Sequence, residues 1–162
     1  MKTAIYPGTF DPITYGHIDV IKKSLNIFDR VIVATTDNVN KNYYFSIDER
    51  QNIINNSLFK DLKLNKNKIK VVSFNNLTIE LCKKYKAAAI IRGLRAVSDF
   101  EYEFQLAGMN KKLNSNIETM FLMSDVENQI ISSKFVKEIA SLGGNINRFV
   151  TKYTVKMLKN KF

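Results

Sequence analysis

Short apolar segments alternate with amphipathic segments along the whole chain, and this alternation restricts the fold more than any other feature. Strands are expected at residues 2–6, 30–35, 68–74, 88–92 and 118–123. Helical patterns cover residues near 16–28, 46–59, 77–86, 98–113, 132–142 and 147–160. Strands connected through helices pair in parallel through right-handed crossovers. The sequence therefore predicts an α/β fold, a doubly wound parallel sheet of five strands with helices at its C-terminal end.

Start signals support two of these helices. Residues 46–49 and 98–101 both have Ser at the first position and Glu at the fourth, which is the pattern of a capping box. We expect Ser46 and Ser98 to be the N-cap residues. A Gly143-Gly144 break separates the last two helices.

The size of the chain predicts one domain over residues 1–162, because 162 residues suit a single core and no linker or repeat interrupts the pattern. Cys82, the single cysteine, lies among Leu77, Ile79 and Leu81, so we expect a buried residue in preference to a reactive thiol. No apolar run reaches the length of a signal peptide or a membrane span. We expect a cytoplasmic protein without a membrane partner.

The net charge of +10 raises the question of nucleic-acid binding. Of the 25 basic residues 20 are Lys and 5 are Arg, and Asn is also abundant, at 18. The densest Lys cluster, over residues 60–70, has no interleaved aromatics on which bases stack. We interpret it as a solvated face and expect no nucleic-acid partner, although a basic binding module remains the alternative of another class. The basic balance also suits a small phosphorylated substrate.

The first segment that carries chemistry is residues 8–17, directly after the first strand. It contains His17, the only histidine of the chain. The only two prolines of the chain lie next to it and in it: Pro7 directly precedes the segment and Pro12 is part of it. Gly16 and His17 open the next helix, whose free N–H groups and positive dipole end form an anion site. That positive end should also hold the pKa of His17 below its usual value of about 6.5. The alternative is that a lone histidine caps the helix or fills a gap.

Two further segments follow later strands. Residues 91–103 contain Arg92 and Arg95, two of the five arginines, and a guanidinium binds phosphate bidentately where Lys does not. Residues 131–138 contain Ser132 and Ser133, which are good N-caps whatever else they do. Because the carboxyl ends of parallel strands form the ligand site of a doubly wound sheet, we expect these segments to meet there.

These segments carry a resemblance to a known family. Residues 8–17 resemble the signature of the nucleotidyltransferase superfamily, whose loop reads His-x-Gly-His, with Thr14 in the first His position. That variant is typical of phosphopantetheine adenylyltransferases, which residues 91–103 and 131–138 also resemble. The resemblance implies a Rossmann-like nucleotidyltransferase fold and transfer of AMP from ATP to 4′-phosphopantetheine. It also implies Mg²⁺ bound with ATP, and a homohexamer.

The resemblance further implies roles for individual residues. The catalytic positions match His17, Lys41 and Arg95. Positions that contact ATP match Thr9, Phe10, His17, Gly93, Leu94, Arg95, Glu103, Asn128, Gln129, Ile130, Ile131, Ser132, Ser133 and Lys134. Positions that contact the acceptor match Thr9, Lys41, Thr78, Arg92, Leu106 and Asn110. From local pattern alone, Lys41 would be a solvated residue, and Glu103 could equally be a solvated helix residue.

Two departures from the family pattern concern the nucleotide. Lys134 stands where relatives often have a third small hydroxyl residue, and Asn128 stands where they have an aromatic one. The nearest alternative functions are adenylylation of nicotinamide mononucleotide and cytidylylation of an alcohol phosphate, whose enzymes usually carry His at the position of Thr14.

Overall fold

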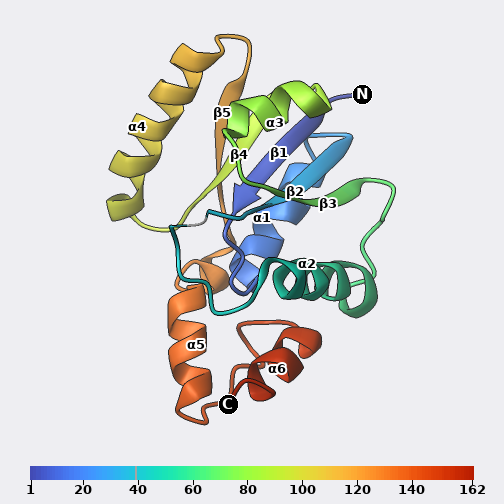
Figure 1. The fold of residues 1–162 in the computed structure, drawn as a ribbon, viewed down its shortest axis with the longest axis vertical. Helices are drawn as coiled ribbons and strands as arrows, with labels where there is room; N and C mark the ends of the chain where they lie inside the picture. The colour runs from blue at the N-terminus through green and yellow to red at the C-terminus, as the bar shows by residue number, and fades with distance from the viewer. Residues whose placement is uncertain (39) are drawn as a thin grey trace.

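The computed structural model describes residues 1–38 and 40–162, apart from the side chain of Ser98, and its centre is one parallel sheet (Figure 1). The strands are β1 (Thr3–Gly8), β2 (Arg30–Thr36), β3 (Ile69–Phe74), β4 (Ala89–Leu94) and β5 (Glu118–Met123). They pair in the order β3-β2-β1-β4-β5, and every neighbouring pair is parallel. The predicted doubly wound, Rossmann-like sheet is confirmed.

Helices connect consecutive strands and cover both faces of the sheet. They are α1 (Tyr15–Leu25), α2 (Ile47–Asn55), α3 (Thr78–Tyr85), α4 (Val97–Leu113), α5 (Ser133–Ser141) and α6 (Lys152–Lys159). A π-helical segment, η1 (Asn56–Asp61), prolongs α2, and a short 3₁₀ helix, η2 (Val126–Asn128), follows β5. Figure 1 shows α5 and α6 at the end of the molecule toward which the strands point. None of the helices in the described ranges is long and apolar enough to cross a bilayer.

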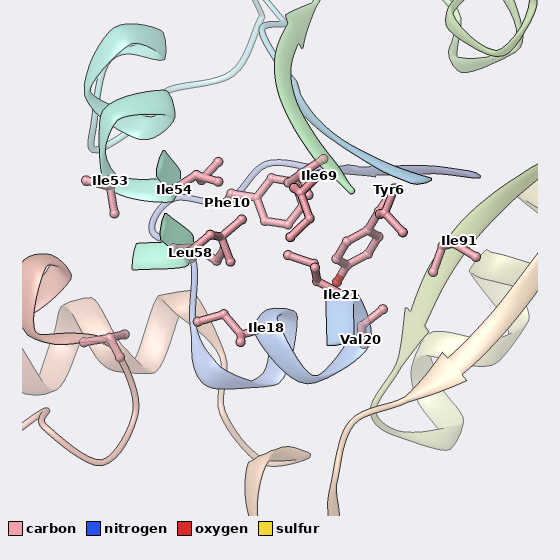
Figure 2. Packing of buried hydrophobic residues seen from close by; sticks show 14 of the residues in the cluster. Tyr6, Phe10, Ile18, Val20, Ile21, Ile53, Ile54, Leu58, Ile69 and Ile91 are labelled. Carbon is pink, nitrogen blue, oxygen red and sulfur yellow. The ribbon is translucent and has the colours of Figure 1, made fainter. Parts of the chain in front are cut away.

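Alternate residues of the strands enter two separate cores, as the two-residue period of a strand requires. Ala4 and Tyr6 of β1 face the larger core, which α1, α2 and α6 complete. Figure 2 shows this packing, with Val20 and Ile21 of α1 near Tyr6. Ile5 faces the smaller core under α3, where Cys82 is fully buried as expected.

Three local expectations need correction or detail. The N-cap expected at Ser46 is confirmed, since Glu49 N donates to Ser46 Oγ over 3.2 Å. The N-cap expected at Ser98 is wrong, because α4 already begins at Val97 after Ala96; the Ser98 side chain itself lies outside the described residues. The last helix begins at Lys152 instead of near residue 147.

The late start of α6 has a packing reason. Ile146 and Val150 are buried in the larger core, and the Phe149 carbonyl accepts a hydrogen bond from Tyr15 N over 2.9 Å. The segment between Gly144 and α6 therefore ties the C-terminal region to the start of α1, while the Phe149 and Val150 N–H groups donate to the Ile146 carbonyl within the segment.

Candidate active site

A cavity of about 920 Å³ opens at the carboxyl ends of β1 and β4. The chain leaves β1 toward β2 and returns to β4 on the other side of β1, so this is the topological switch point of the sheet. The loops after β1, β2, β4 and β5 and the start of α5 all contribute to its wall. The three segments singled out from the sequence therefore meet in one place, as expected.

The loop after β1 is shaped around Phe10. Its ring is 2% exposed and lies edge-on to both Tyr6 and His17, with ring centroids 5.3 and 5.1 Å away. A Cβ on Gly8 would lie 2.8 Å from this ring, so only glycine fits at that position. Since the Phe10 side chain belongs to the core, its predicted contact with ATP falls to its backbone.

His17 is held in one protonation state. Its Nδ1 atom accepts a hydrogen bond from Thr14 N over 3.0 Å and lies 3.1 Å from Thr14 Oγ1. Burial, with the Arg95 charge as a second cause, lowers the pKa of His17 to about 4. The expected direction of the pKa shift is confirmed, but its main cause is desolvation and not the helix end. The neutral ring therefore carries its proton on Nε2, where it can donate to a ligand.

Arg92 is fixed from behind by Glu103. Its Nε and Nη2 atoms each donate to one carboxylate oxygen of Glu103 over 2.7 Å, and Nη1 donates to the Pro7 carbonyl over 3.3 Å. Burial alone would lower the pKa of Arg92, but the hydrogen bonds and charge of Glu103 outweigh it and raise the pKa. Three of the five guanidinium N–H groups are used in these bonds, which leaves two for a ligand.

Other cations surround the cavity with weaker ties. Arg95 Nε lies 3.5 Å from Asp99 with about half of its side chain exposed. Lys41 is exposed on the loop after β2, and Lys134 is exposed in the first turn of α5. Lys137, one turn further along α5, pairs with Asp11 over 3.4 Å. Among the described residues, the wall therefore carries five Lys and Arg side chains against three carboxylates.

The cavity brings together most of the predicted site residues. Those in its wall are Thr9, Phe10, His17, Lys41, Thr78, Arg92, Gly93, Leu94, Arg95, Glu103, Leu106, Ile131, Ser132, Ser133 and Lys134. Four predicted residues lie outside the wall: Asn110, Asn128, Gln129 and Ile130. Asn128 donates to Asp19 over 2.6 Å and Gln129 to the Ser124 carbonyl over 3.2 Å, while Ile130 is 81% exposed.

Sequence reasoning missed three residues that hold the loops of the site in place: Asp11, Lys137 and Arg50. Asp11 is buried and accepts from Tyr44 N and Phe45 N over 2.7 and 2.9 Å, and Lys137 pairs with it. Arg50, on α2, is fully buried and donates to backbone carbonyls of the loops around the cavity. For Arg50, the sequence feature that could have pointed to it is the scarcity of arginine, because it is one of only five arginines in a lysine-rich chain.

Comparison with known proteins identifies the family. The cytidylyltransferase-like family matches residues 5–139. The chain is 67% identical over 161 residues to the phosphopantetheine adenylyltransferase of Pelagibacter ubique, covering 99% of this chain and 98% of that one. It is 49% identical over 162 residues to the enzyme of that name from Caldanaerobacter subterraneus, covering 100% of this chain and 98% of that one.

Solved structures agree on the fold. A nicotinic acid mononucleotide adenylyltransferase from Plasmodium falciparum, complexed with APC, superposes with a TM-score of 0.74 at 19% identity, covering 98% of this chain and 94% of that one. At that identity the likeness concerns the fold alone, whereas the two bacterial relatives match nearly end to end. The chain therefore belongs to the phosphopantetheine adenylyltransferase family of cytidylyltransferase-like nucleotidyltransferases.

Proposed function

We propose that this protein transfers AMP from ATP to 4′-phosphopantetheine, giving dephospho-coenzyme A and pyrophosphate in the penultimate step of coenzyme A biosynthesis. The observation that carries the proposal is that a neutral His17 and an Arg92 fixed by Glu103 line the same cavity, in a chain of this family. The cavity of about 920 Å³ lies at the upper end of the range of small-molecule sites, about 300–1,000 Å³, and so has room for a nucleotide and an acceptor.

The reaction needs no general base. A phosphate monoester with a second pKa of about 6 is largely dianionic at neutral pH and is itself the nucleophile. One of its oxygens bonds to the α-phosphorus of ATP, and the bond from that phosphorus to the bridging oxygen breaks in line, releasing pyrophosphate. The protein supplies position and compensating charge. His17 cannot act as a base through Nδ1, because that atom accepts from Thr14.

Each group has a role in this scheme. The Nε2–H of His17 donates to an α-phosphate oxygen and stabilises the charge that develops there. Arg92 and Lys41 hold the acceptor phosphate, with Glu103 orienting Arg92. Arg95, Lys134 and the N-terminus of α5 hold the other ATP phosphates. Support for the last assignment is that Ser132, Ser133 and Lys134 line the cavity together.

We propose that Mg²⁺ enters bound to the ATP phosphates. In the described part of the chain no three His, Cys, Asp or Glu residues are placed to hold a metal ion. Three acidic residues of the cavity wall, Asp11, Asp99 and Glu103, already pair with Lys137, Arg95 and Arg92. Phosphate oxygens are the remaining hard ligands that Mg²⁺ prefers.

A homohexamer in the cytoplasm completes the proposal. Exposed apolar side chains along α4 support self-association there: Val97 is 91%, Phe104 63% and Met109 61% exposed. Light scattering of the purified protein tests it, and a monomer at micromolar concentration would contradict it.

One assay tests the proposed reaction. Pyrophosphate release from Mg²⁺-ATP is measured with 4′-phosphopantetheine, nicotinamide mononucleotide and glycerol 3-phosphate as acceptors. We expect turnover with the first only. Turnover with either of the others would assign the protein to a different reaction of the superfamily. Dephosphorylated pantetheine is the matched control, because it lacks the attacking oxygens.

A further inference from the structure

Arg50 is a buried charge that the reaction scheme does not use. It lies on α2 with 0% exposure. Burying a guanidinium is costly unless its N–H groups find acceptors. Here Nη1 donates to the carbonyls of Thr9 and Thr36 over 3.0 and 2.7 Å, and Nε donates to that of Phe45 over 3.1 Å. Four of its five N–H groups are used once the weaker bond from Nη2 to Asp37, at 3.4 Å, is included.

The three carbonyls that accept hydrogen bonds from Arg50 all belong to segments that flank the cavity. Thr36 ends β2, and Phe45 lies just before α2, so the two are the ends of the loop that carries Lys41. Thr9 belongs to the other loop, after β1, and lines the cavity. One guanidinium therefore joins both ends of the Lys41 loop to each other and to the loop after β1.

Two further contacts hold the same loop from the inside. The Arg50 guanidinium lies 3.9 Å from the centre of the Tyr43 ring. The Tyr43 hydroxyl in turn accepts from Asn38 N over 2.8 Å, which links the two sides of the loop. Lys41 is thus exposed on a loop whose two ends and whose Tyr43 side chain all contact the buried side chain of Arg50.

We propose that Arg50 is a positioning residue that sets where Lys41 meets the phosphate of the acceptor. This inference rests on the proposed function, in which Lys41 binds that phosphate. In the described structure, none of the hydrogen bonds that Arg50 makes ends on another helix or in the interior of a strand. Its donors instead fix carbonyls of the loop that carries Lys41 and of the loop after β1, both of which line the cavity.

The planar fork of arginine is what the geometry requires. The Thr9 and Thr36 carbonyls are bound by Nη1 and the Phe45 carbonyl by Nε, on different parts of one rigid group. Lysine has one ammonium group with three donors at a single point, so it cannot reach all three carbonyls. Arg50→Lys keeps the charge and removes the positioning.

The test is Arg50→Lys in the full-length enzyme, measured as KM for each substrate. We expect KM for 4′-phosphopantetheine to rise on the order of tenfold, because small misplacements of a binding group are costly. KM for ATP should rise by a smaller factor, because the loop after β1 keeps other contacts such as the bond from Ser133 Oγ to the Pro12 carbonyl. The matched control is Asn52→Ala on the same helix, which removes a 2.9 Å bond to Tyr153 away from the cavity and should leave both KM values unchanged.

A double variant asks whether the effect passes through Lys41. If Arg50 acts by placing Lys41, then Lys41→Ala and Arg50→Lys/Lys41→Ala should have the same KM for the acceptor. The inference would be overturned if the effects of the two substitutions on KM for 4′-phosphopantetheine multiplied in the double variant, or if Arg50→Lys raised KM equally for both substrates. Either result would leave the proposed reaction intact. A wild-type enzyme inactive with 4′-phosphopantetheine would instead overturn the proposed function.

Asp37→Asn provides an independent variant should Arg50→Lys fold poorly. Asp37 is half-exposed and lies outside the cavity wall, and it is the charged acceptor of Arg50. The substitution should raise KM for the acceptor by roughly two- to fivefold, since an ion pair of this exposure is worth about 1 kcal/mol or less. An unchanged KM in a folded Asp37→Asn enzyme counts against the inference.

Discussion

At the scale of single residues, His17 shows how position determines chemistry. The Thr14 N–H occupies Nδ1, and burial with the Arg95 charge keeps the ring neutral. A histidine in this state is a hydrogen-bond donor through Nε2 at every pH near neutrality. In the reaction that we propose, such a donor stabilises charge on a phosphate without exchanging a proton with it, as a reaction with an anionic nucleophile needs.

Substitution of His17 by Ala removes that donor. We expect kcat to fall roughly 10²–10³-fold, as for loss of an oxyanion-type donor, with little change in ATP binding. Steady-state kinetics and a separate ATP titration by calorimetry measure the two quantities. A variant with normal kcat and only weaker ATP binding would remove His17 from the transition state.

The pH dependence of His17 has a definite sign. Its folded pKa of about 4 lies below the unfolded value of 6.5, so on acidification the unfolded chain binds the proton first. The free energy of unfolding contributed by this group is therefore lost as the pH falls from 6.5 toward 4. His17→Asn should lose less stability than wild type between pH 7 and 5 in urea titrations.

An NMR titration of His17, the only imidazole of the chain, should show a midpoint well below pH 6.5. That midpoint should rise when ATP binds, because the phosphates bring negative charge close to the ring.

Arg92 and Glu103 form a pair whose members have unequal roles. Arg92→Ala should weaken 4′-phosphopantetheine much more than ATP, because two of its N–H groups are free for the acceptor phosphate. Glu103→Gln keeps one side-chain oxygen that can accept from Arg92. It should also weaken 4′-phosphopantetheine more than ATP, but by a smaller factor than Arg92→Ala. Comparable losses for both substrates in Arg92→Ala would place this guanidinium in the nucleotide subsite.

At the scale of elements, the start of α5 combines a cap with an anion site. Ser132 Oγ accepts from Phe135 N over 3.1 Å, and Ser133 Oγ donates to the Pro12 carbonyl over 2.7 Å. The second bond ties the helix to the loop that carries the first motif. The first backbone N–H groups of α5 can thus be aimed at the cavity with little freedom to move.

Two substitutions at Ser132 separate capping from ligand binding. Ser132→Ala should lower the free energy of unfolding by about 1 kcal/mol, the usual value of an N-cap. Ser132→Asp keeps the cap and the stability but places a negative charge near the ATP phosphates, so ATP should bind roughly tenfold more weakly. Urea unfolding and calorimetric titration measure these effects. Undiminished ATP affinity in Ser132→Asp would place the phosphates elsewhere.

At the scale of the whole molecule, the site depends on a sheet with a core on each face. The larger core fixes α1 and α2 behind the loops after β1 and β2, while the smaller core buries Cys82 under α3. Burial raises the pKa of the Cys82 thiol to about 12, so the native thiol is unreactive. Because this is the only cysteine in the chain, its reactivity reports unfolding without ambiguity.

Labelling of Cys82 by a thiol reagent should therefore respond to ATP, although Cys82 is not one of the residues that line the cavity. If the thiol reacts only after global unfolding, ATP at about 100 times its Kd should slow labelling about 100-fold. The rate is followed by absorbance at low reagent concentration. Labelling that is slow but insensitive to ATP would show that α3 opens locally, independently of the site.

Much of the fold follows from local pattern. The strand positions and the order of motifs at strand ends were predictable, because side-chain periodicity and right-handed crossovers act over short stretches of chain. The convergence of His17, Arg92 and Ser132 on one cavity follows from that topology. Boundaries were less certain, as the late start of α6 shows, because Ile146 and Val150 pack into a core that the local pattern does not reveal.

The sequence by itself thus determined the parallel sheet, the family, and most of the residues that reach the cavity. Only the tertiary structure decided how these residues are held. The bonds from Arg50 to Thr9, from Phe45 to Asp11 and from Arg92 to Pro7 join positions 41, 34 and 85 residues apart. Such pairings depend on which loops the folded sheet brings side by side, and burial, which lowers the pKa of His17, exists only after folding.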